Sequence, residues 1–345
     1  MTKTITISDL EKLIAHHGMQ AFFRDLLHYL REDFARWEKF HKIPRIAAHV
    51  PKGAIELMPI WDDRYFSYKY VNGHPNNPKS GHLTVVAFGA LADLSTGYPL
   101  LLSEMTVLTA IRTAATSALA SSFLARDNAT TMAVIGTGSQ SEFQVLAHRI
   151  VRPIETIRYF DLDAHTMQRF KHNLQGTKLQ LIECHSAEQA VEGCDIITTA
   201  TAAPGHHEVI KDGWIKPGMH INGIGGDCPG KTELALSTLK HARIFVEFLP
   251  QTQIEGEIQR LAPQEVASHV QGELWELVTK RKKGREFLND ITLYDSVGFA
   301  LEDYSILRLV HDLSDRYKIG TDLPIIPKLS DPKNLISLLG GHHLS

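Results

Sequence analysis

The stretch MAVIGTGSQSEFQVLAHRI, residues 132–150, decides the fold. It reads as an apolar strand, a tight glycine turn and an amphipathic helix, in that order. Gly136 allows the turn, and Gly138 lets the backbone approach a pyrophosphate held at the helix N-terminus. Ser141 takes the third position of this GxGxxS variant and is small enough for helix–strand packing. The stretch therefore predicts a dinucleotide-binding βαβ unit.

An acidic residue follows this motif at the expected distance. Asp161 ends the strand IRYF, 23 residues beyond Gly138. A carboxylate there accepts hydrogen bonds from the adenosine ribose and repels a 2′-phosphate, which favours NAD over NADP. The alternative is that Asp161 only caps the helix that begins at Ala164.

The segments that follow repeat the alternation of strand and helix. The apolar runs LQLIECH, DIITTAT, MHINGIG and ARIFVEF read as strands, and AHTMQRFKHNL and SAEQAVEGC read as helices. Alternating elements of this kind predict a Rossmann-type, doubly wound parallel sheet.

The residues before this unit follow another pattern. A helix is expected from Ile7 to about Phe40, then strands over 46–50, 54–61, 65–71, 83–91 and 98–104, and a helix over 105–125. A last helix covers 299–313. We expect a discontinuous α/β domain for substrate binding and dimerisation (1–118 with 300–345) and an inserted NAD domain (119–299). The tail LLGGHHLS, 338–345, is given no role.

Composition excludes several classes of protein. The 345 residues are 43% hydrophobic and carry a net charge of −3, so no strong field favours nucleic acid or an anionic membrane. No run of about 18 apolar residues predicts a membrane span. Three cysteines form no disulfide framework and indicate a reducing, cytoplasmic compartment. The 19 histidines are scattered without an HExxH motif, so we expect no metal.

The most unusual segment is GIGGDCPGKTEL, residues 223–234. It follows a predicted strand of the nucleotide sheet, where ligands lie beyond the carboxyl ends of the strands. The glycines keep the loop thin, so that a cofactor ring can approach. Asp227 stands alone among them, and its other interpretation is a solvated turn.

At this segment the chain resembles the ornithine cyclodeaminases, in the larger family that includes mu-crystallin. The resemblance extends over nearly the whole chain, in order, and GDCPGKTEL and KYVNGHP are its most specific strings. It is carried by the segments IELMP, FSYKYVNGHP, LTVVAFGALAD, GYPLLLSE, RTAATS, GTGSQSEFQ, DIITTATA, GDCPGKTEL, EGEIQ and DSVGFALEDY.

The resemblance implies an NAD-dependent homodimer that converts L-ornithine to L-proline and ammonia. Arg45, Lys69 and Arg112 would hold the substrate α-carboxylate, and Asp227 would contact the substrate as catalytic acid/base. The residues that would line the NAD site are Thr84, Arg112, Gly136, Gly138, Ser139, Gln140, Asp161, Thr201, Gly223, Ile224, Gly225, Gly226, Lys231, Ser296 and Val297.

The residue types suit this chemistry on their own. A carboxylate needs cationic partners, and arginine binds it in bidentate fashion. Arg112 is a lone cation in a small, apolar helix, which predicts an internal ion pair or a ligand. Glu56, on the strand IELMP, is our candidate for recognising the δ-ammonium group, and it joins Asp227 and Lys69 as a catalytic candidate.

The expected reaction is oxidation at Cα by NAD+, ring closure by the δ-amine, loss of ammonia and re-reduction of the cyclic imine. The alternatives are an NAD-dependent amino-acid dehydrogenase, a lysine cyclodeaminase, a ketimine reductase and a non-enzymatic NAD(P)H-binding, crystallin-like protein. Asp227, Lys69 and Arg112 together speak against the last.

Overall fold

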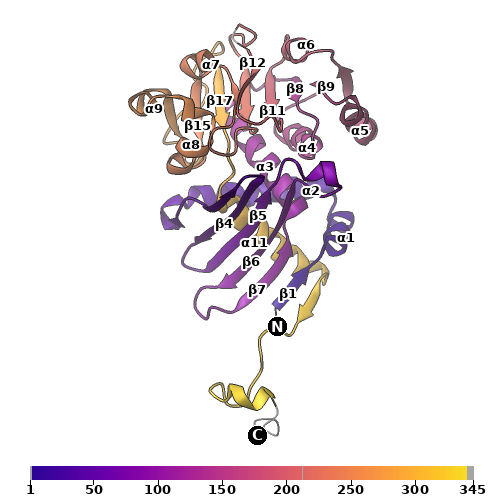
Figure 1. The fold of residues 1–345 in the computed structure, drawn as a ribbon, viewed down its shortest axis with the longest axis vertical. Coiled ribbons are helices and arrows are strands. Elements are labelled where there is room, and N and C mark those ends of the chain that lie inside the picture. Colours follow the sequence, from indigo (N-terminus) through magenta and orange to yellow (C-terminus); the bar gives the residue numbers. More distant parts are fainter. Residues whose placement is uncertain (1, 212, 340–345) are drawn as a thin grey trace.

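The structure is a computed structural model that describes residues 2–211 and 213–339. The body of the molecule contains two large sheets with helices between them, and the C-terminal segment extends beyond the first sheet (Figure 1). Residues 340–345 of the predicted first domain lie outside the described residues.

The second sheet is the predicted doubly wound one. Its eight strands are all parallel, in the order β10-β9-β8-β11-β13-β17-β15-β16. The order reverses between β8 and β11, which is where such sheets bind nucleotides. The predicted fold class is confirmed. The strands are β8 (Thr131–Ile135), β9 (Thr156–Phe160), β10 (Gln180–Glu183), β11 (Ile196–Thr199), β13 (His220–Gly223), β15 (Arg243–Val246), β16 (Val270–Glu273) and β17 (Thr292–Asp295).

Short helices and a small sheet complete this part. The helices are α4 (Ser141–Val151), α5 (Ala164–Leu174), α6 (Ala187–Val191), α7 (Leu236–His241), α8 (Leu249–Glu255), α9 (Pro263–His269) and α10 (Leu274–Val278), with the 3-10 turns η3 (Gln175–Thr177) and η4 (Glu257–Arg260). The short strands β12 (His206–Ile210) and β14 (Thr232–Leu234) pair in parallel, and neither was predicted.

The first sheet has the order β18-β1-β7-β6-β5-β4-β2, with β3 beside β4. Its central pairs are antiparallel, so one face can be apolar and covered while the other stays open. The strands are β1 (Thr2–Ile5), β2 (His41–Lys42), β3 (Ile46–Val50), β4 (Gly53–Trp61), β5 (Tyr65–Gly73), β6 (Val85–Asp93), β7 (Pro99–Glu104) and β18 (Thr321–Leu323). The five predicted strands appear as β3 to β7, whereas β1, β2 and β18 were missed.

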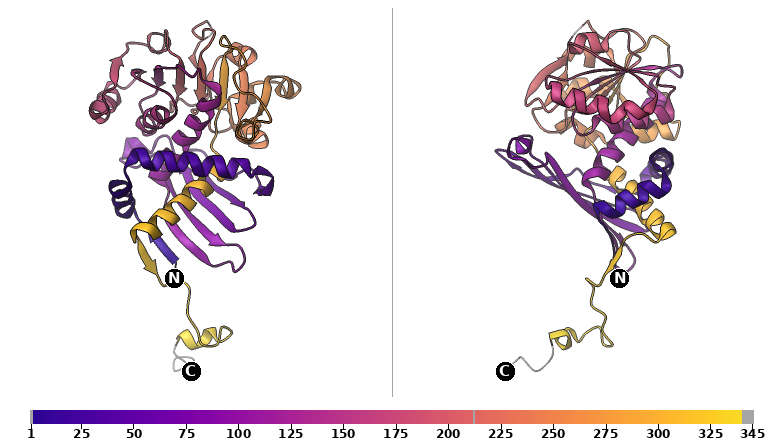
Figure 2. Two further views of the ribbon diagram at one scale, coloured as in Figure 1. Left: turned by 180° about the vertical axis from the view of Figure 1, so that it is seen from behind. Right: turned by 90° about the vertical axis from the view of Figure 1, so that its right-hand side faces the viewer.

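Helices cover one face of this sheet (Figure 2). The predicted helix from Ile7 to Phe40 is interrupted at Gly18, whose φ of 84° an ordinary helix does not allow. The helices are α1 (Ile7–His17), α2 (Met19–Ala35), α3 (Thr106–Leu124) and α11 (Ala300–Tyr317), with the 3-10 turns η1 (Trp37–Lys39), η2 (Asn77–Ser80) and η5 (Leu335–Leu339).

Helix α3 links the two sheets, and the predicted domain boundary at 118/119 falls inside it. One continuous core surrounds α3 and α11 and includes Phe245 and Tyr294 of the doubly wound sheet. By length and composition α3 is apolar enough to cross a membrane, but 83% of that window is buried inside the protein. Burial of this kind is typical of a core helix.

Candidate active site

A cavity of about 640 Å³ opens beside both sheets and collects most of the predicted site residues. Its size lies within the usual range for small-molecule sites, roughly 300–1,000 Å³. The predicted residues that line it are Arg45, Glu56, Lys69, Thr84, Arg112, Gly138, Ser139, Gln140, Thr201, Ile224, Gly225, Asp227, Lys231, Ser296 and Val297. Gly136, Asp161, Gly223 and Gly226 are not among its lining residues and lie behind or beside it.

The glycine turn closes one wall of the cavity. Gly136 has a φ of 95°, and a Cβ there would lie 2.6 Å from the Ala200 carbonyl oxygen. The backbone N–H of Thr137 donates to Asp161 Oδ2 over 2.6 Å, which ties the turn to the end of β9. Asp163, not Asp161, caps α5 by accepting from the backbone N–H of His165. The helix-cap interpretation of Asp161 is therefore wrong.

This wall fits a dinucleotide phosphate. Helix α4 begins after Gln140 without a side-chain cap, so the N–H groups of Glu142 and Phe143 in its first turn have no acceptor among the described residues and remain available to an anion. Gln140 Oε1 is buried and has no hydrogen-bond partner among the described residues. Ser139 and Gln140 both line the cavity. The unpaired N–H groups at the start of α4 and the unpaired Gln140 Oε1 are therefore next to a space large enough for a ligand.

The opposite wall carries two buried cations. Lys69 on β5 is fully buried, and its Nζ lies 2.9 Å from Asp303 Oδ1. Arg112 on α3 contacts Glu302 Oε2 at 2.6 Å through Nη1 and Asp303 Oδ1 at 3.1 Å through Nε. Burial and the neighbouring Arg112 charge lower the pKa of Lys69 to about 8, against the opposing effect of Asp303. Burial disfavours the charge of Arg112, but Asp303 and Glu302 outweigh it and raise its pKa.

The acids that balance these cations were missed at the sequence level. Glu302 and Asp303 are adjacent on α11, in the segment DSVGFALEDY, which was quoted only for its resemblance. Both are completely buried, and burial raises the pKa of Glu302 to about 7 against the lowering effect of Arg112. The signal available was an acidic pair flanked by apolar residues in the first turn of a predicted helix, which predicts cationic partners if the turn is buried.

Arg45 forms a clamp between the two parts of the chain. Its Nη1 donates to Glu56 over 2.9 Å, and its Nε lies 3.1 Å from Glu255 on α8. Its Nη2 donates to the carbonyl oxygens of Val297 and Gly298 over 2.6 and 2.7 Å. Most of the guanidinium donors are therefore occupied within the protein, and Arg45 holds the Glu56 carboxylate at the cavity wall.

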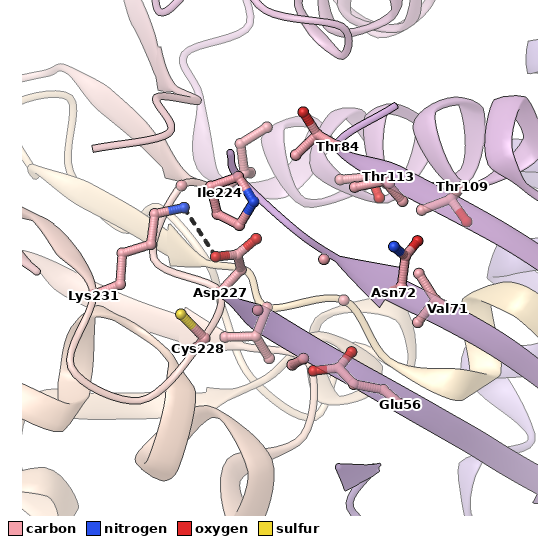
Figure 3. A pocket seen from close by; sticks show the side chains of 18 of the residues that line it. Glu56, Val71, Asn72, Thr84, Thr109, Thr113, Ile224, Asp227, Cys228 and Lys231 are labelled. Carbon is pink, nitrogen blue, oxygen red and sulfur yellow. Dashed lines mark hydrogen bonds and ion pairs between the residues drawn. The ribbon is translucent and has the colours of Figure 1, made fainter. Parts of the chain in front are cut away.

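Asp227 lies across the cavity from Glu56 (Figure 3). Its carboxylate bonds the Lys231 ammonium group at 3.0 Å, and its side chain is 54% exposed. Lys231 is the cation that Asp227 contacts, whereas Lys69 is occupied by Asp303. Burial disfavours the charge of Lys231, but Asp227 more than compensates and raises the pKa of Lys231.

Three buried carboxyl groups support the loop that carries Asp227. Asp295 accepts the N–H groups of residues 257 and 258, and Glu257 accepts those of residues 233 and 234. Glu233 in turn accepts the N–H of Thr201 over 2.9 Å. Burial raises the pKa of all three, that of Asp295 to about 7. We call Glu233, Glu257 and Asp295 the carboxyl ladder. None of the three was predicted, although the quoted segments GDCPGKTEL, EGEIQ and DSVGFALEDY contain one each.

The carboxyl ladder gives the glycines of this loop a second function. A Cβ on Gly225 would overlap the Glu233 carboxylate, and a Cβ on Gly226 would lie 2.7 Å from Glu257 Oε1. The missing side chains thus allow two buried acids to approach the loop from behind. The sequence predicted that these positions are glycine because the loop must be thin enough for a cofactor ring to approach. The contacts show a further reason, which is that two buried carboxylates pack against the loop.

Within residues 2–211 and 213–339, no group of three His, Cys, Asp or Glu side chains lies where it could hold a metal ion. Cys184, Cys194 and Cys228 are free thiols. The site thus consists of a backbone-lined wall, a cationic wall and two facing carboxylates. A doubly wound domain with such a cavity at its switch point defines an enzyme of the Rossmann class.

Comparison with known proteins agrees with this class. The profile of the ornithine cyclodeaminase/mu-crystallin family matches residues 10–317. Ornithine cyclodeaminase of Agrobacterium fabrum (strain C58) is 51% identical over 335 residues, covering 97% of this chain and 94% of that one. The chain belongs to the ornithine cyclodeaminase/mu-crystallin family, as the resemblance predicted.

Two solved structures share the whole architecture. A lysine cyclodeaminase, solved for its recognition of L-lysine, L-ornithine and L-2,4-diaminobutyric acid, has a TM-score of 0.91 and 28% identity, covering 98% of this chain and 99% of that one. An archaeal alanine dehydrogenase dimer with bound NAD has a TM-score of 0.86 and 31% identity, covering 94% and 99%.

Proposed function

We propose that this protein is an NAD-dependent ornithine cyclodeaminase that converts L-ornithine to L-proline and ammonia. One observation carries the proposal: a single cavity combines buried cations at Lys69 and Arg112 with carboxylates at Asp227 and Glu56 that line the cavity and each bind one cation of the protein. This charge pattern complements a diamino acid, which has one carboxylate and two amines. The 51% identity to the Agrobacterium fabrum enzyme supports the same substrate.

NAD fits the backbone-lined wall. Gly138, Ser139 and Gln140 would hold its phosphates at the uncapped start of α4, and Asp161 would accept from the adenosine ribose. When bound, NAD supplies the hydride acceptor and donor that this chain lacks. Thr84, Thr201, Ile224, Gly225, Lys231, Ser296 and Val297 complete the lining.

The cationic wall would bind the substrate carboxylate. Lys69 and Arg112 are held rigidly by Asp303 and Glu302, so they need little rearrangement to accept an anion. Because burial raises the pKa of Glu302 to about 7, part of the balancing negative charge is weakened near neutral pH. A carboxylate ligand would restore that balance.

Asp227 would remove the proton from the substrate α-ammonium group. The nitrogen lone pair must be free before Cα can be oxidised, and Asp227 is the exposed carboxylate on this side of the cavity. The Lys231 ammonium group donates to Asp227 Oδ1 over 3.0 Å and so orients the carboxylate. The carboxyl ladder keeps the loop in place.

Glu56 would recognise the δ-ammonium group. One of its oxygens accepts from Arg45, and the carboxylate remains at the cavity wall opposite Asp227. Arg45 would therefore contribute mainly by holding Glu56 in place. Only guanidinium N–H groups that are not used in its four contacts with the protein would be able to donate to the substrate carboxylate.

We also propose a homodimer formed through the open face of the first sheet. Ile46, Leu57, Tyr70 and Phe88 lie side by side in register across β3 to β6. Three of them are 38–58% exposed, and the Tyr70 and Phe88 rings stack at 5.0 Å. An exposed apolar row of this kind is typical of an interface, and the archaeal relative is a dimer.

The free cysteines support a reducing, cytoplasmic location.

The deciding experiment follows L-ornithine with a trace of NAD+. We expect proline and ammonia in equal amounts, far above the NAD+ supplied, without build-up of NADH. Ammonia with stoichiometric NADH would instead establish a dehydrogenase. No turnover of ornithine, with turnover of lysine to pipecolate, would place the protein with the lysine cyclodeaminases.

The variant Asp227→Asn tests the assignment of the base. Because an amide cannot accept the α-ammonium proton, we expect turnover to fall by at least about 10³-fold. The dissociation constant of NADH, measured by the fluorescence of its reduced nicotinamide, should stay within about twofold. Full activity in this variant would contradict the role of Asp227.

A further inference from the structure

The C-terminal segment 324–339 leaves the body of the protein after β18 (Figure 1). Strand β18 pairs with β1 at the edge of the first sheet, and the chain then runs away from that edge and ends in the turn η5. Figure 2 shows it bending toward the open side of the sheet, away from the covering helices. We call residues 324–339 the C-terminal arm.

The C-terminal arm is rich in large apolar side chains that its own chain leaves in water. They are Ile325, Leu335, Ile336, Leu338 and Leu339, each between 50% and 68% exposed. Burial of apolar surface is the main favourable contribution to folding and association, so five such residues within sixteen positions are typical of a segment that packs against a surface.

We infer that the C-terminal arm packs onto the sheet domain of a second copy of this chain. The helix-covered face of its own sheet is already filled by the core around α2, α3 and α11. The arm bends toward the other side, where the apolar row of Ile46, Leu57 and Phe88 is exposed. A second copy docked on that face would stand in the direction that the arm takes.

The dimensions permit this exchange. Sixteen residues span up to about 50 Å when extended, and Pro324, Pro327 and Pro332 favour extended backbone that cannot close into a regular helix. Each copy would then offer one arm and receive one, as a two-fold axis requires. This inference rests on the proposed homodimer and adds a contact to it.

A photocrosslinking amino acid, p-benzoylphenylalanine, placed at position 338 of the full chain tests the inference. We expect ultraviolet light to produce a covalent species of about twice the 38.6 kDa chain mass on a denaturing gel. Mass spectrometry should place the crosslink within residues 1–104 of the other copy. The same substitution at Phe287, which is 69% exposed on a loop of the other domain, should leave the chain at its single mass.

Sedimentation equilibrium provides the second measurement. The double variant Leu335→Ser/Leu338→Ser should raise the dimer dissociation constant by at least about tenfold, whereas Phe287→Ser should leave it unchanged. Crosslinks that all lie within one chain, or an unchanged dimer dissociation constant in the double variant, would overturn the role of the C-terminal arm without contradicting the dimer. A monomeric wild-type protein would overturn both.

Discussion

The two walls of the cavity are built in opposite ways. The glycine wall comes from residues 136–140 and Asp161, which are close in sequence, and backbone groups supply most of its contacts. The cationic wall joins Lys69 to Asp303, 234 residues away, and its contacts are charged side chains. A wall made of backbone groups from neighbouring residues can be recognised as a sequence motif. A wall made of buried ion pairs cannot, because folding brings together partners that are far apart in the sequence.

The largest expected effect is on the cationic wall. The variant Asp303→Asn would leave Lys69 and Arg112 short of one buried negative charge, which we expect to cost about 3 kcal/mol of unfolding free energy. The pKa of Lys69 should fall below its value of about 8, because burial and Arg112 remain while Asp303 is lost. The KM for substrate should then rise at least tenfold at pH 8.

Asp33→Asn is the matched control for that variant. Asp33 is likewise fully buried and bridges two cations, Arg36 and Arg308, both at 2.6 Å, but it does not line the cavity. It should lose stability in a urea titration without a change in KM. Equal KM values in Asp303→Asn and the wild type would show that the cationic wall does not bind the substrate.

The next effect concerns the loop between the two walls. In Gly225→Ala the new methyl group overlaps the Glu233 carboxylate, so that the loop carrying Asp227 must shift. We expect kcat to fall about 100-fold with little loss of secondary structure by circular dichroism. Gly176→Ala, where a Cβ meets nothing within 4 Å, should behave as the wild type. Normal kcat in Gly225→Ala would contradict the supporting role of the carboxyl ladder.

A smaller effect lies beneath the glycine wall, on helix α4. His148 is fully buried, donates through Nδ1 to the Gln144 carbonyl oxygen, and has its pKa lowered by burial to about 4. The unfolded chain binds this proton near pH 6.5, so stability is complete above that pH and is lost as pH falls toward 4. The loss attributable to His148 should reach roughly 2 kcal/mol by pH 5.

The variant His148→Asn removes this titration. Between pH 5 and pH 7 the free energy of unfolding of the wild type should therefore rise by roughly 2 kcal/mol relative to that of the variant. Buried carboxyl groups with raised pKa values, such as Asp295, lower the stability as pH rises toward 7. They are present in both proteins, so their contribution cancels when the free energies of unfolding of the variant and the wild type are subtracted. Equal slopes would contradict a neutral, buried His148.

The smallest effect is on the choice of cofactor. Asp161→Asn keeps an acceptor for the Thr137 N–H but removes the charge that would repel a 2′-phosphate. We expect the ratio of NAD to NADP affinity to fall by about tenfold while the melting temperature changes little. An unchanged ratio would argue against a ribose role for Asp161.

Much of the architecture could be predicted from local patterns. Six strands of the doubly wound sheet followed from alternating strands and helices, whereas β16 and β17 were missed, and β3 to β7 followed from their turns. The errors have local causes. Gly18 breaks the first predicted helix by its positive φ, and short strands such as β1 and the edge strand β18 are too brief to show an alternating pattern. The domain boundary at 118/119 stays a prediction, and it falls inside α3, the helix that links the two sheets.

The sequence by itself determined the family and the doubly wound fold and predicted the candidate site residues, because glycine turns, strand periodicity and specific strings are local. Only the tertiary structure decided what those residues contact. It paired Lys69 with Asp303, Asp227 with Lys231 and Arg45 with Glu56. It also placed the carboxyl ladder behind the glycine loop. Buried charges must be balanced in space, and the chain can meet that requirement with partners hundreds of residues away.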